Sequence, residues 1–577
     1  MKVFAGSGLR LFASAVALLG LLFAACGGDD SGGGEAKSDD QKDMAPASQQ
    51  VLRTRITGEP KTIDPHLTNF ANETTITKPL FSGLFTFDPE MRVVPSVAAE
   101  IPTAENGGVS KDGLTYTIKL RKDAKWSDGK PVTAKDFEYS MKRAMDPKLA
   151  GPYTSNYFAL KGAEEYNTAL GTSAAPKTAT DAQLAQLRDA LGVKAKDDYT
   201  IEYQLKEPDV SWLQKLAIWT AYPVRQDIVE RFGDKWTEAG NIVSNGAFML
   251  KEWAHNERFV MVPNPYWHGE PKPKLQQLII LMMENDAAAY AAYLNNELDI
   301  VGVPPANRRE VQQPTNPLNK ELKRGGDGTT FALMMNHKVP PFDNQKVREA
   351  FALAFDRKAF VEVTQSGVGF PVTTWIASNQ PGHNPELGKQ FSFDPVKAKA
   401  ALAAAGFPDG RGLPKVTFLA VANDTNRNVI APFVIENYKK NLGIDVEYEF
   451  VDTATYTSRY TRNQHQIAIG GWHLDWPYPD NWLPNILGCN QSNNHTQYCN
   501  PKFDELVKQA ARETDDKKRL ALYDQAQKLA LDEVALAPIY EREYFVLVKP
   551  WVRDLVITNL DSARGDYNYH RIWIAAH

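Results

Sequence analysis

Residues 112–143 read DGLTYTIKLRKDAKWSDGKPVTAKDFEYSMKR, and this stretch decides the class of fold. It opens with an Asp-Gly turn signal, after which apolar and polar side chains alternate as in a half-buried strand. A second turn signal occupies residues 126–131. Thr133 follows, with Asp136 at the capping-box spacing, and predicts the start of a helix. A strand and a capped helix in one short stretch indicate a mixed α/β chain.

The same signals recur on both sides of this stretch. Residues 197–205 repeat the turn and the alternating strand, residues 51–57 alternate before a run of prolines, and residues 76–87 read as a helix that runs into a strand. Helical and strand patterns alternate through the rest of the chain, without a short-period repeat. The chain has 577 residues, more than one hydrophobic core usually serves, and we therefore expect two or three domains.

The composition is that of an ordinary globular protein, with 43% hydrophobic and 23% charged residues. A net charge of −5 and the lack of a basic stripe argue against nucleic acid as a partner. Many of the 12 tryptophans and 22 tyrosines are needed for the core, and a surplus of aromatic side chains is also what a large ligand cavity requires.

The N-terminus has the layout of a secretory signal. Two basic residues precede an apolar run, residues 11–25, that is short for a membrane span and ends in small residues. Cys26 directly after Ala-Ala resembles the lipobox of bacterial lipoproteins, in which the cysteine is acylated after cleavage. We therefore expect residues 1–25 to be a lipoprotein signal peptide and residues 26–50 to be the lipidated cysteine and a disordered tether to a membrane. The alternative is a plain signal peptide with an incidental cysteine.

With Cys26 assigned to lipidation, Cys489 and Cys499 remain, ten positions apart in a loop rich in Gly, Asn and Ser. In an extracytoplasmic protein such a pair predicts a disulfide. A metal site is the rival interpretation, but only His495 lies between the two cysteines and the spacing is not that of a zinc motif.

Residues 470–482, GGWHLDWPYPDNW, follow a short apolar run that reads as a buried strand. The two glycines mark the end of the strand or the close approach of another backbone, and the prolines that follow exclude a helix. Asp475 lies between two indoles, an arrangement that suits a ligand with a positive charge on an apolar or amide body. The alternative is an ordinary strand end, with the tryptophans in the core and Asp475 capping a turn.

A family becomes recognisable from six segments in order: EPKTIDPHLT, LFSGLFTFDP, DGLTYTIKLRKDAKWSDGKPVTAKDFEYSMKR, GNIVSNGAFMLKEW, PFDNQKVREAFALAFDR and YFVLVKPWV. In order and spacing they resemble the oligopeptide- and dipeptide-binding proteins of bacterial ABC importers, a family of extracytoplasmic solute-binding proteins with three domains. The resemblance covers about residues 51–573.

This resemblance implies a periplasmic-binding-protein-like α/β fold of two lobes joined by a hinge, with an additional inserted domain. The expected domains are lobe I in three segments (51–85, 218–327 and 546–577), domain II inserted in it (86–217), and lobe III (328–545). Hinge closure is expected to trap the ligand between the lobes. The implied partners are short peptides and the permease subunits of an ABC importer, with no cofactor; we expect a monomer.

In oligopeptide binders the peptide lies extended between the lobes, hydrogen-bonded through its main chain as an added strand. Backbone groups do this work, so residue identity at such positions is loosely constrained, and a glycine leaves room for the ligand. Read onto this chain, the flanking segments are Asn69-Phe70-Ala71 and Gly471-Trp472-His473.

The resemblance also assigns roles to single side chains. Asp475 falls where the family places the carboxylate that holds the α-ammonium of the peptide, and Trp472 and Trp476 are expected to cover that ammonium. A salt bridge from Asp475 to a protein arginine is the alternative. Tyr153 and Tyr540 are each expected either to touch the ligand or simply to pack.

The anchor for the peptide carboxylate is left open. Arg459 and Arg462 lie in the right neighbourhood of the sequence, but neither aligns with a known anchor. Where relatives have Asp-Val before the site strand, this chain has Gln466-Ile467, which leaves the preferred peptide length open.

Two other functions compete with peptide binding. A secreted glycosidase or peptidase would use Asp475 and Asp480 as a carboxylate pair, yet the sequence has no GxSxG and no HExxH motif. A binder of the same family for a sugar, a nickel chelate or haem would have no use for a carboxylate at position 475, so Asp475 favours a ligand with an amine.

Overall fold

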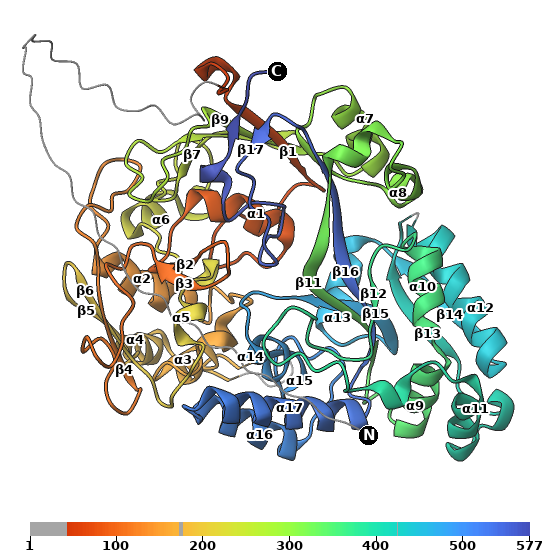
Figure 1. Cartoon of the computed structure of the whole chain (residues 1–577). Helices are drawn as coiled ribbons and strands as arrows, with labels where there is room; N and C mark the ends of the chain where they lie inside the picture. Colours follow the sequence, from red (N-terminus) through yellow and green to blue (C-terminus); the bar gives the residue numbers. More distant parts are fainter. Residues whose placement is uncertain (1–42, 172–176, 424) are drawn as a thin grey trace, which may run out of the picture. The chain divides into compact units, whose positions relative to one another are not determined.

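A seven-stranded sheet is the largest sheet of the fold in the computed structural model, which describes residues 43–171, 177–423 and 425–577 (Figure 1). β11 and β16 are long antiparallel neighbours at its centre, and β13 runs parallel to β14 and β15. The sheet order is β10 (Ile300–Gly302), β16 (Ala537–Val548), β11 (Leu322–Met335), β15 (Ile467–His473), β13 (Val416–Val421) and β14 (Val446–Val451), with β12 (Phe370–Pro371) beside β16.

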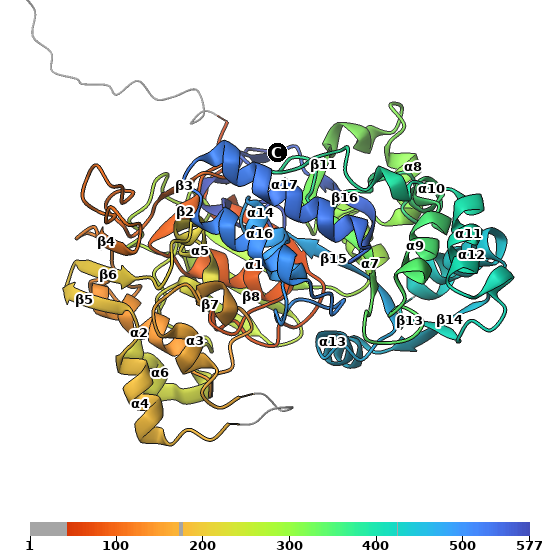
Figure 2. The ribbon, with the colours of Figure 1, turned by 90° about the horizontal axis from the view of Figure 1, so that it is seen from below.

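Three helices, α9, α11 and α12, contact one another beside this sheet, and Figures 1 and 2 both place them near β13 and β14. The apolar side chains of this part of the sheet, such as Leu333 and Ile467, are fully buried in one core with the inner faces of these helices. Along the chain between β11 and β16 the helices are α9 (Gln345–Ala354), α10 (Arg357–Thr364), α11 (Pro395–Ala404), α12 (Ala431–Leu442), α13 (Thr453–Thr461), α14 (Pro479–Trp482), α15 (Pro484–Leu487), α16 (Pro501–Arg512) and α17 (Asp516–Asp532).

A four-stranded sheet is built from the first strand of the described chain and three strands two hundred residues later. Its order is β1 (Val51–Ile56), β9 (Gln277–Met282), β8 (Arg258–Pro263) and β7 (Phe248–Ala254), with β1 parallel to β9. The helices that accompany it are α1 (Ala71–Leu80), α6 (Gln226–Phe232), α7 (Asp286–Leu294) and α8 (Pro305–Val311), and β17 (Val552–Arg553) pairs with β18 (Trp573–Ile574) near the C-terminus.

The strand and the capped helix predicted for residues 112–143 are both present in the structure. The alternating strand is β4, and the strand predicted at 197–205 is its antiparallel neighbour β6. The backbone N–H of Thr133 donates to the Asp136 carboxylate at 2.8 Å and begins α2, as the capping-box spacing predicts. The strands between α1 and α6 along the chain are β2 (Phe85–Phe87), β3 (Val93–Pro95), β4 (Thr115–Lys119), β5 (Val193–Asp197) and β6 (Thr200–Gln204). The α-helices between them are α2 (Ala134–Ala144), α3 (Ala163–Asn167), α4 (Asp181–Asp189) and α5 (Trp212–Lys215).

The tether expected over residues 26–50 is too long. Residues 45–50 belong to the folded unit that runs to the C-terminus, and they include the short 3-10 helix η2 (Ala47–Gln49). Gln50 is buried, and its amide donates to the carbonyls of Ala45 at 2.9 Å and Ile574 at 2.7 Å. Ile574 lies 524 residues away in the sequence, so the polar local composition could not reveal this contact. The signal peptide and Cys26 lie outside the described residues.

Both expected passages between lobe I and lobe III fall inside continuous strands. The boundary at residues 327/328 lies within β11, and the boundary at 545/546 lies within β16. The pairing of the two strands is interrupted between Gly326 and Thr330. The ladder between β11 and β16 is therefore broken at the first of the two expected crossings.

Candidate functional site

A cavity of about 440 Å³ gathers side chains from segments that lie far apart in the sequence. They come from the start of α1, from Tyr153 and Trp219, from β11 and β15, from α13, and from residues 560–562. Eight of the ten predicted ligand-binding residues line it: Asn69, Phe70, Ala71, Tyr153, Gly471, Trp472, His473 and Asp475.

The edge of β15 toward the cavity is unpaired over most of its length. β11 pairs with all seven residues of β15, but on the other side β13 pairs only with Ile467 and Ala468. From Ile469 to His473, β15 has no second strand neighbour in the described part of the chain, and these five residues line the cavity. Free N–H and C=O groups along a strand are the template for adding one more extended chain.

Gly471 has a different role from the one expected. A Cβ at this position would lie 2.9 Å from the Phe331 ring and 3.0 Å from the Thr330 carbonyl oxygen. The glycine therefore lets β11 approach β15 closely, and the space that it leaves is filled by the protein and not by a ligand.

The segment Asn69-Phe70-Ala71 cannot offer its first two amides to a ligand. The N–H groups of Asn69 and Phe70 both donate to the Glu73 carboxylate, at 2.7 and 3.0 Å, as the N-terminal cap of α1. Phe70 is 47% exposed, unusual for a large apolar residue, and lines the cavity. This segment therefore presents an apolar wall where the resemblance implied a strand partner.

Asp475 is a buried carboxylate without a cation. Its oxygens accept from the Tyr153 hydroxyl and from the Asn481 amide, both at 3.3 Å, and it forms no ion pair with any described residue. Burial raises the pKa of Asp475 to about 7, against the opposing effects of the Asn481 hydrogen bond, the Lys78 charge and the Tyr153 hydroxyl. The predicted alternative, a salt bridge to a protein arginine, is not what the structure has.

Only one of the two flanking indoles reaches the cavity. Trp472 lines it, and its indole N–H donates to the Asn481 carbonyl at 3.0 Å, so that Asn481 holds both Trp472 and Asp475. Trp476 is 1% exposed, donates to Asp480 at 2.7 Å and does not line the cavity. The expectation that Trp476 covers a ligand ammonium does not match this placement, because the turn after β15 directs the second indole into the core.

The two predicted tyrosines differ in the same way. The Tyr153 hydroxyl reaches Asp475, and its ring meets Trp219 edge-on at 5.3 Å in the cavity wall. Tyr540 is stacked on Phe331 at 5.0 Å inside the core and does not line the cavity. For Tyr540 the structure therefore favours the packing alternative.

The carboxylate pair that an enzyme would need is not presented in the cavity. Asp480 is buried, lies 3.6 Å from the Lys215 ammonium and is absent from the cavity lining. Of the arginines in the expected neighbourhood of a carboxylate anchor, Arg459 is occupied by Glu449 at 2.6 Å.

Arg542 and Asp561 line the cavity although the sequence did not single them out. Arg542 lies in Glu541-Arg542-Glu543, three charged residues inside the otherwise apolar strand β16. That interruption was the available signal. Asp561 has no comparable signal, because it lies in an irregular segment that only the tertiary fold brings to the cavity.

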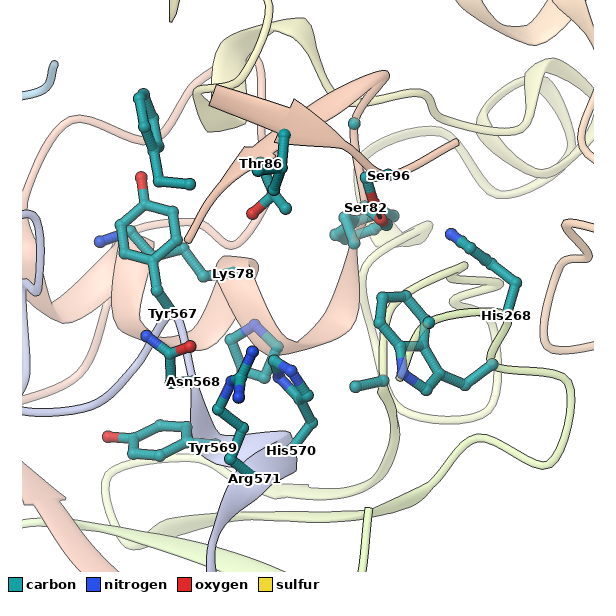
Figure 3. Close-up of a pocket in the computed structure, with 18 of the residues that line it drawn as sticks. Lys78, Ser82, Thr86, Ser96, His268, Tyr567, Asn568, Tyr569, His570 and Arg571 are labelled. Atoms are coloured by element: carbon teal, nitrogen blue, oxygen red, sulfur yellow. Dashed lines mark hydrogen bonds between the residues drawn. The ribbon is translucent and has the colours of Figure 1, made fainter. Parts of the chain in front are cut away.

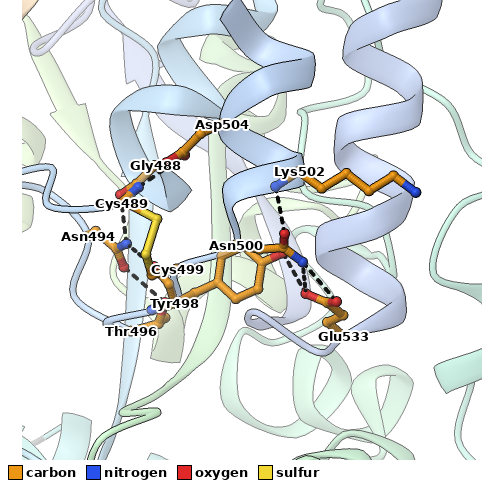
Figure 4. Close-up of a disulfide and its surroundings, with 10 residues drawn as sticks. All are labelled: Gly488, Cys489, Asn494, Thr496, Tyr498, Cys499, Asn500, Lys502, Asp504 and Glu533. Carbon is orange, nitrogen blue, oxygen red and sulfur yellow. Dashed lines mark hydrogen bonds between the residues drawn. A yellow bond between two sulfur atoms is a disulfide. The ribbon is translucent and has the colours of Figure 1, made fainter.

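The disulfide loop forms part of the cavity wall. Cys489 and Cys499 are joined, and the loop between them is held by Asn494, whose amide donates to the carbonyls of Gly488 at 2.9 Å and Tyr498 at 2.7 Å (Figure 4). Two other residues of this loop, Asn493 and His495, line the cavity.

A second cavity, of about 220 Å³, contains none of the predicted site residues. It lies between α1 and the segment Tyr567–Arg571 (Figure 3). Lys78 lines it, and the Lys78 ammonium bonds Asp566 at 3.3 Å and the Ser562 hydroxyl at 3.0 Å. Because Ser562 lines the first cavity, this buried ammonium stands between the two cavities.

The sequence and the fold match one family throughout. The model of the bacterial extracellular solute-binding proteins, family 5 Middle, matches residues 92–494. The periplasmic oligopeptide-binding protein OppA of Escherichia coli is 31% identical over 516 residues, covering 88% of this chain and 90% of that protein. OppA of Bacillus subtilis is 30% identical, covering 92% and 93%. The structure of the murein tripeptide-binding protein MppA of E. coli superposes with a TM-score of 0.78 at 28% identity, covering 91% of this chain and 99% of MppA. The chain belongs to the family 5 extracellular solute-binding proteins of bacteria.

Proposed function

We propose that this protein captures short peptides and delivers them to the permease of an ABC importer. The observation that carries the proposal is the unpaired edge of β15, which leads within two residues to the buried, cation-free carboxylate of Asp475. An extended peptide offers a main chain for the edge and an α-ammonium for the carboxylate.

In this site, affinity would come from contacts to the peptide main chain and amino group, which do not depend on the peptide side chains. Backbone hydrogen bonds to β15 are available to any peptide sequence, since every residue except proline has both a donor and an acceptor. An ammonium at Asp475 would form a charge-assisted hydrogen bond in a site with little water, which is stronger than a neutral one. The aromatic walls, including Phe70, Trp219 and Trp472, can cover varied side chains without demanding one of them.

The proposal places the protein outside the cytoplasm, on a lipid anchor at Cys26. The family name and the signal-like N-terminus support an extracytoplasmic site, and the Cys489–Cys499 pair suits an oxidising compartment. Among the described residues, no helix has the length and apolar character to cross a bilayer. The protein would act as a monomer without catalysis, closing on its ligand as the lobes approach.

Replacing the Asp475 carboxylate tests the assignment of the ligand amine. Asp475→Asn should weaken binding of free-amine peptides by more than about tenfold in calorimetry, because it removes the charge that pairs with the ammonium. N-acetylated versions of the same peptides should bind weakly to both proteins, with little further loss.

Asp409→Asn is the matched control, since this aspartate is 80% exposed and outside the cavity. Equal losses for free and acetylated peptides would mean that Asp475 is structural. Native mass spectrometry of the purified protein decides the class of ligand: released short peptides support the proposal, and a sugar, chelate or haem would replace it.

A further inference from the structure

Two arginines share one buried aspartate at the edge of the candidate ligand cavity. Asp327 is fully buried, and its Oδ2 atom accepts from Arg542 Nε at 2.5 Å and from Arg564 Nη2 at 3.0 Å. Two guanidinium groups and one carboxylate leave one positive charge uncompensated. That charge lies at the cavity, where an anionic group of a ligand could pair with it.

Arg542 is the member of the cluster that faces the ligand space. Its side chain is 45% exposed and lines the cavity, whereas the Arg564 side chain is 13% exposed. Arg542 Nη2 donates to the Thr329 hydroxyl at 3.1 Å, which fixes the plane of the guanidinium. Its Nη1 donors have no partner among the described residues, so one side of the guanidinium fork is free.

His473 of β15 contacts the same threonine as Arg542. Its Nδ1 atom lies 3.0 Å from the Thr329 hydroxyl oxygen, and its Nε2 atom is buried without a hydrogen-bond partner in the described part of the chain. The Thr329 hydroxyl therefore contacts both Arg542 and His473. Burial also keeps the imidazole neutral, with a pKa of about 3. The Arg542 Nη1 donors and the His473 Nε2 atom therefore both lack a partner among the described residues.

We propose that Arg542 binds a carboxylate of the ligand, in the cavity where Asp475 binds its ammonium. This rests on the proposed function. A carboxylate is the ligand group whose two oxygens match the guanidinium fork. One threonine hydroxyl separates Arg542 from His473, and one residue separates His473 from Asp475, so the two charged groups reach neighbouring parts of one extended ligand. The favoured ligand is a dipolar chain, with its carboxylate either at the end of a short peptide or on an acidic side chain near the amino end.

Arg542→Gln is a suitable variant because Asp327 keeps Arg564 as its ion-pair partner. Arg324→Gln is the matched control. Arg324 lies on β11, is 43% exposed, and pairs with Glu543 of β16 at 2.6 Å, but it does not line the cavity. Both variants remove one half-exposed guanidinium from the same pair of strands. Arg542→Lys retains the charge and should recover part of the binding.

The test is calorimetry with four peptides: trialanine, trialanine amide, Ala-Glu-Ala amide and Ala-Gln-Ala amide. Arg542→Gln should weaken the carboxylate-bearing peptides by about tenfold or more and change the neutral ones by less than about twofold. A loss confined to trialanine identifies the terminal carboxylate, and a loss confined to the Glu peptide identifies the acidic side chain. Arg324→Gln should leave all four affinities unchanged.

Equal losses for all four peptides, or no loss for any, would overturn the role of Arg542. If the unmodified protein binds no peptide at all, the proposed function fails, and the solutes that copurify with each protein decide about Arg542. Carboxylate-bearing solutes released from the unmodified protein and depleted in Arg542→Gln support the site. The same content in both, including none, overturns it.

Discussion

At the scale of single residues, Asp475 controls when the site can work. Its carboxyl group must be ionised to hold an ammonium, yet burial raises its pKa to about 7. Tyr153 and Asn481 donate to it but bring no formal charge. The positive charge that balances the Asp475 carboxylate would therefore come from the ligand amine.

Affinity for free-amine peptides should fall as the pH is lowered through 7. The empty site is protonated below its raised pKa, whereas the occupied site requires the carboxylate, so binding releases a proton below about pH 7. We expect about a fourfold loss between pH 8 and pH 6, because the α-amino group of the ligand, with a pKa of about 8, is itself partly deprotonated at pH 8. Calorimetry in buffers of different ionisation enthalpy measures both the affinity and the proton release.

Asp475→Asn should abolish this dependence, and N-acetylated peptides should show none. A free-amine peptide whose affinity is constant from pH 8 to pH 6 would show that Asp475 does not exchange its proton on binding.

At the scale of elements, the site depends on how β11 and β15 come together. β11 supplies one full set of hydrogen bonds to β15, and the early end of β13 leaves the opposite edge open. The closeness of β11 and β15 rests on Gly471, where a side chain would meet Phe331 and Thr330.

Gly471→Ala should lower the free energy of unfolding by about 1–3 kcal/mol, because a methyl group would be forced against a packed ring and a backbone carbonyl. Chemical denaturation measures the effect. Gly302→Ala is the matched control, since Gly302 lies on β10 of the same sheet with nothing within 4 Å of the added carbon. Equal stability of the two variants would contradict the packing role of Gly471.

At the scale of the whole molecule, the cavity joins segments that the resemblance assigns to three different domains. Tyr153 of the expected domain II bonds Asp475 of the expected lobe III, and the expected crossings lie within β11 and β16. A ligand in this cavity would touch all of these parts at once, so its binding energy favours the closed arrangement.

Adding peptide to protein freed of ligand should reduce the radius of gyration in small-angle X-ray scattering. Closure brings the lobes together around the ligand, as in hinge-bending binding proteins generally. Asp475→Asn at the same peptide concentration should show a smaller change. Unchanged scattering, with binding verified by calorimetry, would mean that the lobes do not move on binding.

The fold was predictable from local signals that agree with one another. The alternation of β4, the capping box at Thr133 and the order of the family motifs each pointed to the observed elements. Local signals failed where the decisive partner is distant. Gln50 was assigned to a tether because its local sequence is polar, whereas its hydrogen bonds to Ile574 depend on the tertiary fold.

The site was predictable in position but not in the direction of each side chain. Asp475 and Trp472 line the cavity as expected, whereas Trp476 and Tyr540 face cores that only the tertiary packing defines. The occupied amide of Phe70 was in principle visible, because Glu73 stands at the capping-box spacing. The charged residues that interrupt apolar β16 were a signal for Arg542, but only the tertiary fold places that side chain at the cavity.

The open edge of β15 lies inside a cavity, and this has a consequence for what can reach it. An exposed strand edge invites neighbouring sheets to dock and aggregate, and many proteins blunt such edges with charge or proline. In this protein the edge is protected because it lies inside the cavity. A folded protein is too bulky to bring its own edge strand into a space of about 440 Å³, whereas a thin, unfolded chain can enter. The cavity therefore selects extended chains over folded domains by size alone, independently of their amino-acid sequence.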